Sequence, residues 1–219
     1  PCPPGQRVRL TFDDGPSPTA TDAILDLLRQ HGVRASFFVL VHKAARHPQT
    51  IARIVNEGHL LALHGGDHRV ALGRSRATLR HALSHARAQL ETIAGRPTPL
   101  YRPSHGWKSR ALLGAVRAAG LRMVFWDYGV WDTDAPAPRV LLERLCCATP
   151  APDSPRRPII LLHDGRDDDP ADPGHAAALL TALAAWLPTI CAPASADRAV
   201  PAPTTTASAA TSPRARRLP

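Results

Sequence analysis

The chain has 219 residues, 44% of them hydrophobic, so it is long enough for one large domain with a packed core. No apolar run approaches the roughly 20 residues of a membrane span, so we expect none. A net charge of +9 fits acidic partners such as wall polymers. Nucleic acid is not an expected partner, because nearly all the basic residues are arginines and the excess reflects a bias in composition. The chain begins at Pro1, which indicates a processed or trimmed product.

Apolar runs rich in β-branched residues alternate with segments of helical period along the chain. They predict strands at 7–12, 35–41, 59–63, 99–102, 121–126 and 158–162. Between and after these runs they predict helices at 18–31, 50–56, 77–93, 109–119, 138–146 and 174–187. Such units favour parallel strands with helices outside, in a (β/α) barrel or an open doubly wound sheet.

The end of the chain gives a weaker signal. Residues 188–192 predict a short closing strand at most. From Pro193 the sequence is rich in Pro, Ala, Thr and Ser and cannot bury enough apolar surface to order itself. We therefore expect an N-terminal extension at 1–6, a single α/β domain at 7–192 and a disordered tail at 193–219.

The four cysteines form no C-x-x-C pair, which argues against a thiolate zinc site. Cys146 and Cys147 fall in an apolar helical stretch, and we expect them to be buried free thiols. A disulfide that involves Cys2 or Cys191 is left open.

Short polar motifs follow the predicted strands, where the carboxyl ends of parallel strands carry the chemistry of such folds. Asp13 and Asp14 end the first strand just before Gly15 and Pro16. One carboxylate can bind a metal while the other handles a proton. An ordinary acidic loop before a helix is the competing interpretation.

His64 and His68 have a spacing that can place two imidazoles on one metal. The same spacing recurs at His81 and His85, inside an Arg-rich amphipathic helix that we expect to face solvent. Spacing alone is therefore weak evidence, and the strand end and glycines around the first pair favour it. With one carboxylate, the first pair would make a three-ligand site of the catalytic zinc type.

Three further polar groups follow later strands. Arg102 can keep a catalytic carboxylate ionised and oriented. Asp132 or Asp134 can hold Arg102, and His163 would lie across the cavity as a general acid. A surface arginine and a buried structural histidine are the alternatives. Two tryptophans, Trp126 and Trp131, lie near Asp132 and either stack on a sugar or pack the rim.

These motifs, in this order over roughly residues 7 to 187, resemble the polysaccharide deacetylases of carbohydrate esterase family 4, the NodB-homology domain. The resemblance implies a distorted (β/α)7 barrel and metal-dependent removal of acetyl groups, with zinc (Zn2+) or another divalent ion such as Co2+. Asp13 matches the base that takes a proton from metal-bound water. Asp14, His64 and His68 match the metal ligands.

The resemblance also assigns roles to later residues. Arg102 matches the group that orients the base, and Asp132 matches the acid that holds this arginine. His163 matches the general acid, and Leu161 the wall of the acetyl-methyl pocket. The backbone N–H of His105 matches the donor to the oxyanion.

The chain departs from the family pattern at several places. Gly65 stands where Ser or Thr is common, and His105 stands where an aromatic residue is usual. Thr133 stands where a Trp normally follows the acid that Asp132 matches. Trp131 is a candidate to supply the missing substrate wall. Residues 187–190 replace the usual Gly-aromatic turn, so we expect weak or incomplete closure. None of these changes removes a ligand, base or acid, and we expect an active enzyme.

The sequence thus predicts a hydrolase of N-acetyl groups on N-acetylglucosamine glycans, either chitin oligomers or peptidoglycan. An O-acetyl xylan esterase and a non-catalytic glycan-binding barrel are the alternatives. The acetylated glycan is the expected partner, the monomer the expected state, and a secreted or cell-envelope location follows from the substrate class alone.

Overall fold

The computed structural model describes residues 3, 5–68, 73–165 and 173–191. Seven strands form one curled parallel sheet in the order β5-β4-β3-β2-β1-β7-β6. They are β1 (Arg9–Gly15), β2 (Ala35–Leu40), β3 (Leu60–Gly65), β4 (Leu100–Tyr101), β5 (Arg122–Met123), β6 (Tyr128–Gly129) and β7 (Ile159–His163). The expected single α/β domain with a distorted, incompletely closed barrel is confirmed.

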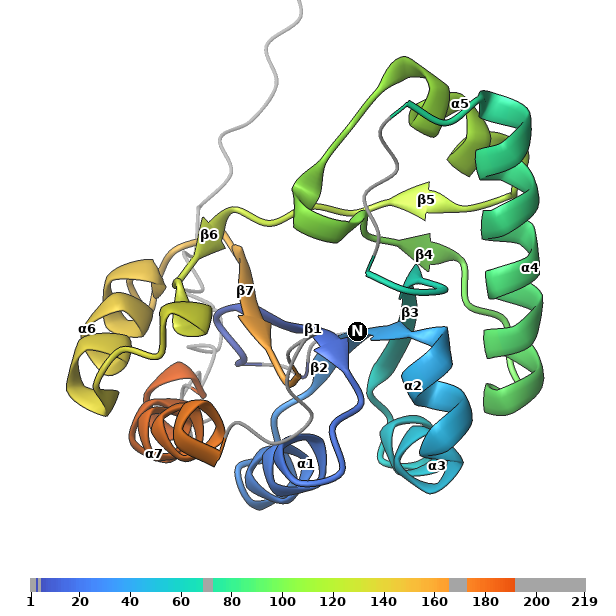
Figure 1. The fold of residues 1–219 in the computed structure, drawn as a ribbon. Helices are drawn as coiled ribbons and strands as arrows, with labels where there is room; N and C mark the ends of the chain where they lie inside the picture. The colour runs from blue at the N-terminus through green and yellow to red at the C-terminus, as the bar shows by residue number, and fades with distance from the viewer. Residues whose placement is uncertain (1–2, 4, 69–72, 166–172, 192–219) are drawn as a thin grey trace, which may run out of the picture.

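The helices lie outside the curved sheet, in an arc that runs from α4 and α5 round to α6 (Figure 1). They are α1 (Ala20–Gln30), α2 (Val41–Arg46), α3 (Pro48–Asn56), α4 (Arg76–Ala94), α5 (Arg110–Ala118), α6 (Pro138–Ala148) and α7 (Pro173–Ile190). Local signals fix their ends: Ser75 and Ser109 cap α4 and α5 by accepting backbone N–H groups, and Gly95 ends α4 in a left-handed conformation.

Side chains alternate across each long strand, which gives the sheet two different faces. On β1, Leu10 and Phe12 pack into the core beneath the helices, whereas Thr11 and Asp13 lie on the opposite, interior face. The same alternation places Ile160 and Leu162 of β7 in the core. The polar side chains of these strands therefore lie on the interior face and at the strand ends.

Two predicted elements differ from the structure. The run at 121–126 gives only the two-residue β5, and the chain then crosses to the far edge of the sheet, where β6 begins. The closing strand at 188–192 is wrong: α7 continues through Pro188 to Ile190, and Cys191 makes only an isolated antiparallel bridge with Gln6. Burial of Leu187 and Ile190 in the core keeps this last turn helical.

The helix α2 was not predicted, because it follows β2 with no polar break and its short sequence carries little periodicity.

The prediction of buried thiols is also wrong. Cys146 and Cys147 are exposed, because α6 buries Leu141, Leu145 and Ala148 and turns the intervening positions outward. Cys191 is half-buried and free. Cys2 and the predicted tail at 193–219 lie outside the described residues. Within the described part of the chain, no helix is long and apolar enough to cross a membrane.

Candidate active site

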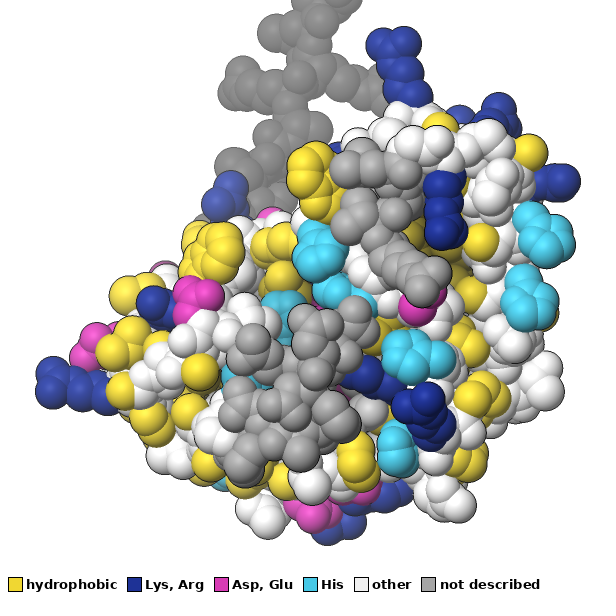
Figure 2. Space-filling view, viewed as in Figure 1, with side chains coloured by type: hydrophobic (Ala, Val, Ile, Leu, Met, Phe, Trp, Pro, Cys, Tyr) yellow, Lys and Arg dark blue, Asp and Glu magenta, His cyan; other side chains and the backbone are white. Residues whose placement is uncertain are grey.

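The carboxyl ends of the strands surround a cavity of about 550 Å³. Nine of the ten predicted site residues line it, namely Asp13, Asp14, His64, His68, His105, Trp131, Asp132, Leu161 and His163. The tenth, Arg102, is fully buried beside Asp13. Seen from the side of Figure 1, histidine side chains gather near the centre of the surface (Figure 2). The strand ends thus bring together residues from distant parts of the chain, as predicted.

A bulge at the end of β1 turns two consecutive carboxylates into this cavity. The pairing with β2 shifts register between Asp13 and Gly15, and Asp14 takes a positive φ of 70°. Without that irregularity, alternation would point Asp14 away from Asp13. A Cβ at Gly15 would lie 2.2 Å from the Asp164 carboxylate, so this turn requires glycine.

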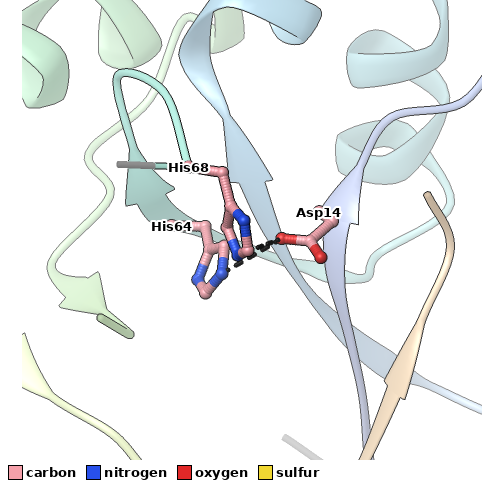
Figure 3. Close-up of side chains that lie close together, drawn as sticks. All are labelled: Asp14, His64 and His68. Atoms are coloured by element: carbon pink, nitrogen blue, oxygen red, sulfur yellow. Dashed lines mark ion pairs between the residues drawn. The ribbon is translucent and has the colours of Figure 1, made fainter. Parts of the chain in front are cut away.

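Asp14, His64 and His68 point toward one another (Figure 3). Asp14 Oδ1 lies 3.2 Å from His64 Nε2 and 3.3 Å from His68 Nε2. Donors about 2.0–2.2 Å from a tetrahedral zinc ion are about 3.3–3.6 Å apart, close to the two distances from Asp14 to the imidazoles. Asp14 Oδ1 is buried and makes no hydrogen bond. The three residues therefore fit a divalent metal.

The electrostatics of this trio keep the carboxylate ionised. Burial alone would raise the pKa of Asp14, but contact with His64 and the charges of His64, His163 and His68 outweigh it and lower the pKa to about 2. Burial would lower the pKa of His64, and Asp13 and Asp14 raise it overall. Displacing the proton from His64 would therefore be part of binding a metal.

The backbone between the two histidines explains one departure from the family pattern. Gly65 has φ +139°, and a Cβ there would lie 2.9 Å from the backbone oxygen of Asp67. A side chain would strain this turn, which brings His68 back beside His64. The control pair behaves as expected: His81 and His85 are both exposed on α4.

Arg102 holds Asp13 but does not contact Asp132 through any hydrogen bond or ion pair found among the described residues. Its NH1 donates to Asp13 Oδ1 at 2.7 Å and to Thr11 Oγ1 at 2.9 Å. Its Nε and NH2 donate to the backbone oxygens of Val124 and Phe125. The predicted pairing of Asp132 with Arg102 is therefore wrong, because backbone carbonyls of the segment after β5 occupy the guanidinium donors that Asp13 and Thr11 leave available.

Asp132 instead holds His163. Its Oδ1 lies 3.0 Å from His163 Nδ1, and its Oδ2 accepts the His163 backbone N–H at 2.8 Å. Burial would lower the pKa of His163, but the Asp132 carboxylate, helped by Asp13 and Asp14, raises it to about 9. Burial would raise the pKa of Asp132, yet His163 and His175 lower it overall. His163 is thus held protonated near neutral pH.

The remaining predicted residues form the walls of the cavity. His105 has φ 55°, its ring lies 4.3 Å from that of His68, and Leu161 and Trp131 face the same cavity. Trp131 is 67% exposed and has φ 54°, so it lies at the rim rather than in the packing. Trp126 also lines the cavity, beneath Gly106.

Sequence reasoning missed three residues that support the site. His175 Nε2, from α7, lies 3.4 Å from Asp132 Oδ2. Asp164 is buried, accepts the Thr21 hydroxyl at 2.6 Å, and has a pKa that burial raises to about 7. Lys43 donates to the backbone oxygen of Asp14 at 2.8 Å. Asp164 directly follows His163, and Lys43 lies just after the predicted strand at 35–41, whereas no local pattern points to His175.

The fold and site together define an α/β half-barrel protein with a polar cluster at its strand ends. The polysaccharide deacetylase family model matches residues 1–124, more than half of the chain, and the chain belongs to this family.

Individual relatives agree. The chain is 34% identical over 166 residues to a chitooligosaccharide deacetylase of Azorhizobium caulinodans, covering 75% of this chain and 76% of that protein. It is 31% identical over 163 residues to a peptidoglycan-N-acetylglucosamine deacetylase of Bacillus cereus, covering 74% of each. A family 4 carbohydrate esterase from Streptomyces lividans, solved in complex with acetate, superposes with a TM-score of 0.68 at 25% identity and covers 84% of this chain and 90% of that one.

Proposed function

We propose that this protein is a metal-dependent deacetylase that hydrolyses N-acetyl groups of N-acetylglucosamine-containing glycans, either chitin oligomers or peptidoglycan. One observation carries the proposal. Asp13, which is held by Arg102, and His163, which is held by Asp132, lie on either side of the donor trio. Asp13 and His163 are register partners on β1 and β7. A paired base and acid beside a candidate metal site match the needs of amide hydrolysis.

Asp14, His64 and His68 would hold the metal, for which Zn2+ is the expected ion and Co2+ an alternative. When bound, such an ion polarises the acetyl carbonyl and makes a coordinated water more acidic.

Asp13 would accept the proton of the attacking water. Its Oδ1 is occupied by Arg102, which leaves Oδ2 as the free basic atom on the side of His64, 3.8 Å from His64 Nδ1. The guanidinium limits rotation of the Asp13 carboxylate, so the base would be oriented before substrate binds.

His163 would donate the proton that the leaving amine needs. Asp132 holds Nδ1, so Nε2 is the atom that can face the substrate. The raised pKa, about 9, keeps the proton on the ring until the amine forms. Asp132 would thereby orient the acid His163. The family resemblance had implied that it holds Arg102 instead.

The cavity walls would select an acetylated sugar. Leu161 offers an apolar surface to the acetyl methyl, and the exposed ring of Trp131 offers a stacking face for a sugar. The backbone N–H of His105 would donate to the developing oxyanion.

The substrate class is supported by relatives whose names state chitooligosaccharides and peptidoglycan. A secreted or cell-envelope location and action as a monomer are parts of the same proposal. Analytical ultracentrifugation would test the monomer directly.

Two alternatives keep the same site. An O-acetyl xylan esterase would use the same base and ligands, because the ester carbonyl presents the same geometry. A non-catalytic glycan-binding barrel would use the cavity alone, and it would not need Asp13 and His163 as a paired base and acid.

The test measures acetate release from N-acetylglucosamine oligomers and from acetylated xylan. It compares chelated protein, zinc-restored protein and the Asp13→Asn variant, with Asp153→Asn as a matched loss of an exposed carboxylate. Zinc-dependent release from the oligomers, lost only in Asp13→Asn, is the expected result. Release from xylan alone would make the protein an esterase, and no release from either by zinc-loaded protein would favour the binding barrel.

A further inference from the structure

A second cavity, of about 500 Å³, opens at the other end of the barrel, where the strands begin. Three arginines line it: Arg9 starts β1, Arg34 precedes β2, and Arg157 lies two residues before β7. This cavity shares no lining residue with the candidate active site. We call it the N-terminal mouth.

Strand alternation explains why Arg9 and Arg34 turn inward. Arg9 has the same parity on β1 as Thr11 and Asp13, both on the interior face. Likewise Arg34 shares parity with Ser36 and Phe38, which also line this cavity. The interior row that ends in the candidate base on β1 therefore begins with a guanidinium.

The arginines at this mouth have no carboxylate beside them in the cavity wall. The described residues that line the cavity include no Asp or Glu, and the nearby Asp127 carboxylate accepts the backbone N–H of Ile159. Among the described residues, the side chains of Arg9 and Arg157 form no ion pair, and Arg34 donates only to the backbone oxygen of Glu57. The Glu57 carboxylate pairs with Arg53 instead, at 2.8 Å. Three cations around one cavity repel one another and favour an anion between them.

The wall below the arginines is apolar. Leu60, Val124 and Ile159 are half-buried and face this cavity, beside the ring of Phe38. Half-buried hydrocarbon inside a barrel gains from contact with an apolar ligand. A bare inorganic ion would leave this wall wet, so the two halves of the cavity together fit a ligand that is charged at one end and apolar at the other.

We propose that the N-terminal mouth binds a small organic anion, with its carboxylate or phosphate group on Arg9, Arg34 and Arg157 and its hydrocarbon part on the apolar wall. The floor of the site adjoins Arg102: Thr11 accepts from its NH1, Val124 accepts from its Nε, and the Phe38 ring lies 4.0 Å from its guanidinium carbon. A bound anion would therefore contact the groups that hold this arginine.

The test is calorimetric titration of the full chain with hexanoate and with hexyl phosphate, which distinguishes the two head groups. Hexanol, acetate and inorganic phosphate serve as probes that lack either the charge or the hydrocarbon. Saturable binding of at least one hexyl anion, tighter than all three of these probes, is expected. The measurement does not use deacetylation, so its outcome is independent of the proposed function.

Matched variants separate the site from general charge. Arg9→Gln/Arg157→Gln should weaken binding of the hexyl anion by about tenfold or more, since each lost charge-assisted contact is large. Arg80→Gln/Arg117→Gln removes two exposed arginines elsewhere and should change it less than about twofold. Equal weakening in both double variants would overturn the proposal. Thermal melts of both double variants would check that the substitutions leave the fold intact.

Amide chemical shifts locate the ligand. The proposal expects shifts at Thr11, Ser36 and Val124, together with the Arg102 Nε–H resonance. Shifts confined to His105 and His163 would mean that the anion binds at the candidate active site, and the proposal would be wrong. Absence of saturable binding by either hexyl anion would also overturn it.

Discussion

The two ends of the barrel contain opposite arrangements of charge. At the carboxyl ends of the strands, ionisable groups meet partners: Asp13 meets Arg102, and Asp132 meets His163. At the amino ends, Arg9 and Arg157 line a cavity whose described lining residues include no carboxylate. The same strands supply both ends of the barrel. The difference lies in the type of interior-facing residue at the start of a strand and at its end. Paired groups orient protons, whereas unpaired cations attract ligands.

The largest effect is expected from removing a metal ligand at the carboxyl end. His64→Ala should abolish tight zinc binding and lower deacetylation by more than about a hundredfold, because even residues that only support a ligand cost 10–100-fold. Zinc titration and acetate release measure both effects. His81→Ala is the matched control from the second, exposed pair and should retain zinc and activity. Equal losses in both variants would contradict the assignment of the trio.

A smaller, pH-dependent effect is expected at Asp132. This carboxylate raises the pKa of His163 to about 9, so we expect wild-type His163 to stay protonated up to that pH and activity to fall above it. In Asp132→Asn the pKa should drop toward about 6.5, which leaves roughly thirtyfold less protonated acid at pH 8. The alkaline limb of the rate profile measures this shift. Asp134→Asn, an exposed neighbour, should leave the limb in place.

A smaller effect on activity is expected at His175, which contacts Asp132 but does not line the cavity. His175→Gln should lower kcat by about tenfold with little change in KM, since it loosens the carboxylate that orients the acid. Steady-state kinetics on glycan oligomers measure the split. His81→Gln provides the exposed control, and a change confined to KM would assign His175 to substrate binding instead.

The smallest effect is expected at the N-terminal mouth in the absence of ligand. Arg9→Gln/Arg157→Gln should raise the free energy of unfolding by about 0.5 kcal/mol at low salt, because it relieves repulsion between exposed like charges. The gain should vanish in 1 M salt. Urea denaturation at both salt concentrations tests this. A loss of stability would show that these arginines have partners in the folded protein.

Much of the site could be predicted because strand ends are readable from the sequence. Asp13, Asp14, His64 and His163 each follow an apolar run, and parallel strands bring such ends together. The partner of Arg102 could not be read in the same way. It depends on how the crossing segment after β5 runs, and that segment has no periodicity to fix it.

Other misses have equally local causes. His175 lies on α7, whose sequence is apolar almost throughout, so its contact with Asp132 depends on tertiary packing alone. Cys146 and Cys147 looked buried because their neighbours are apolar, although the spacing of Leu141 and Leu145 sets the buried face of α6. The incomplete closure was correctly predicted from the end of the chain, and the curved barrel from the family resemblance.

Arg102, which holds Asp13, also performs a structural task. Val124 and Phe125 lie where the chain leaves β5 for β6, and their carbonyls are bound by Arg102 instead of by a neighbouring strand. One side chain thus substitutes for part of the missing strand contact at the open side of the barrel. A lineage that abandoned catalysis could lose Asp14 or His163 and keep its architecture. It would have to retain Arg102, so survival of this residue alone in a related sequence is evidence of the fold and not of activity.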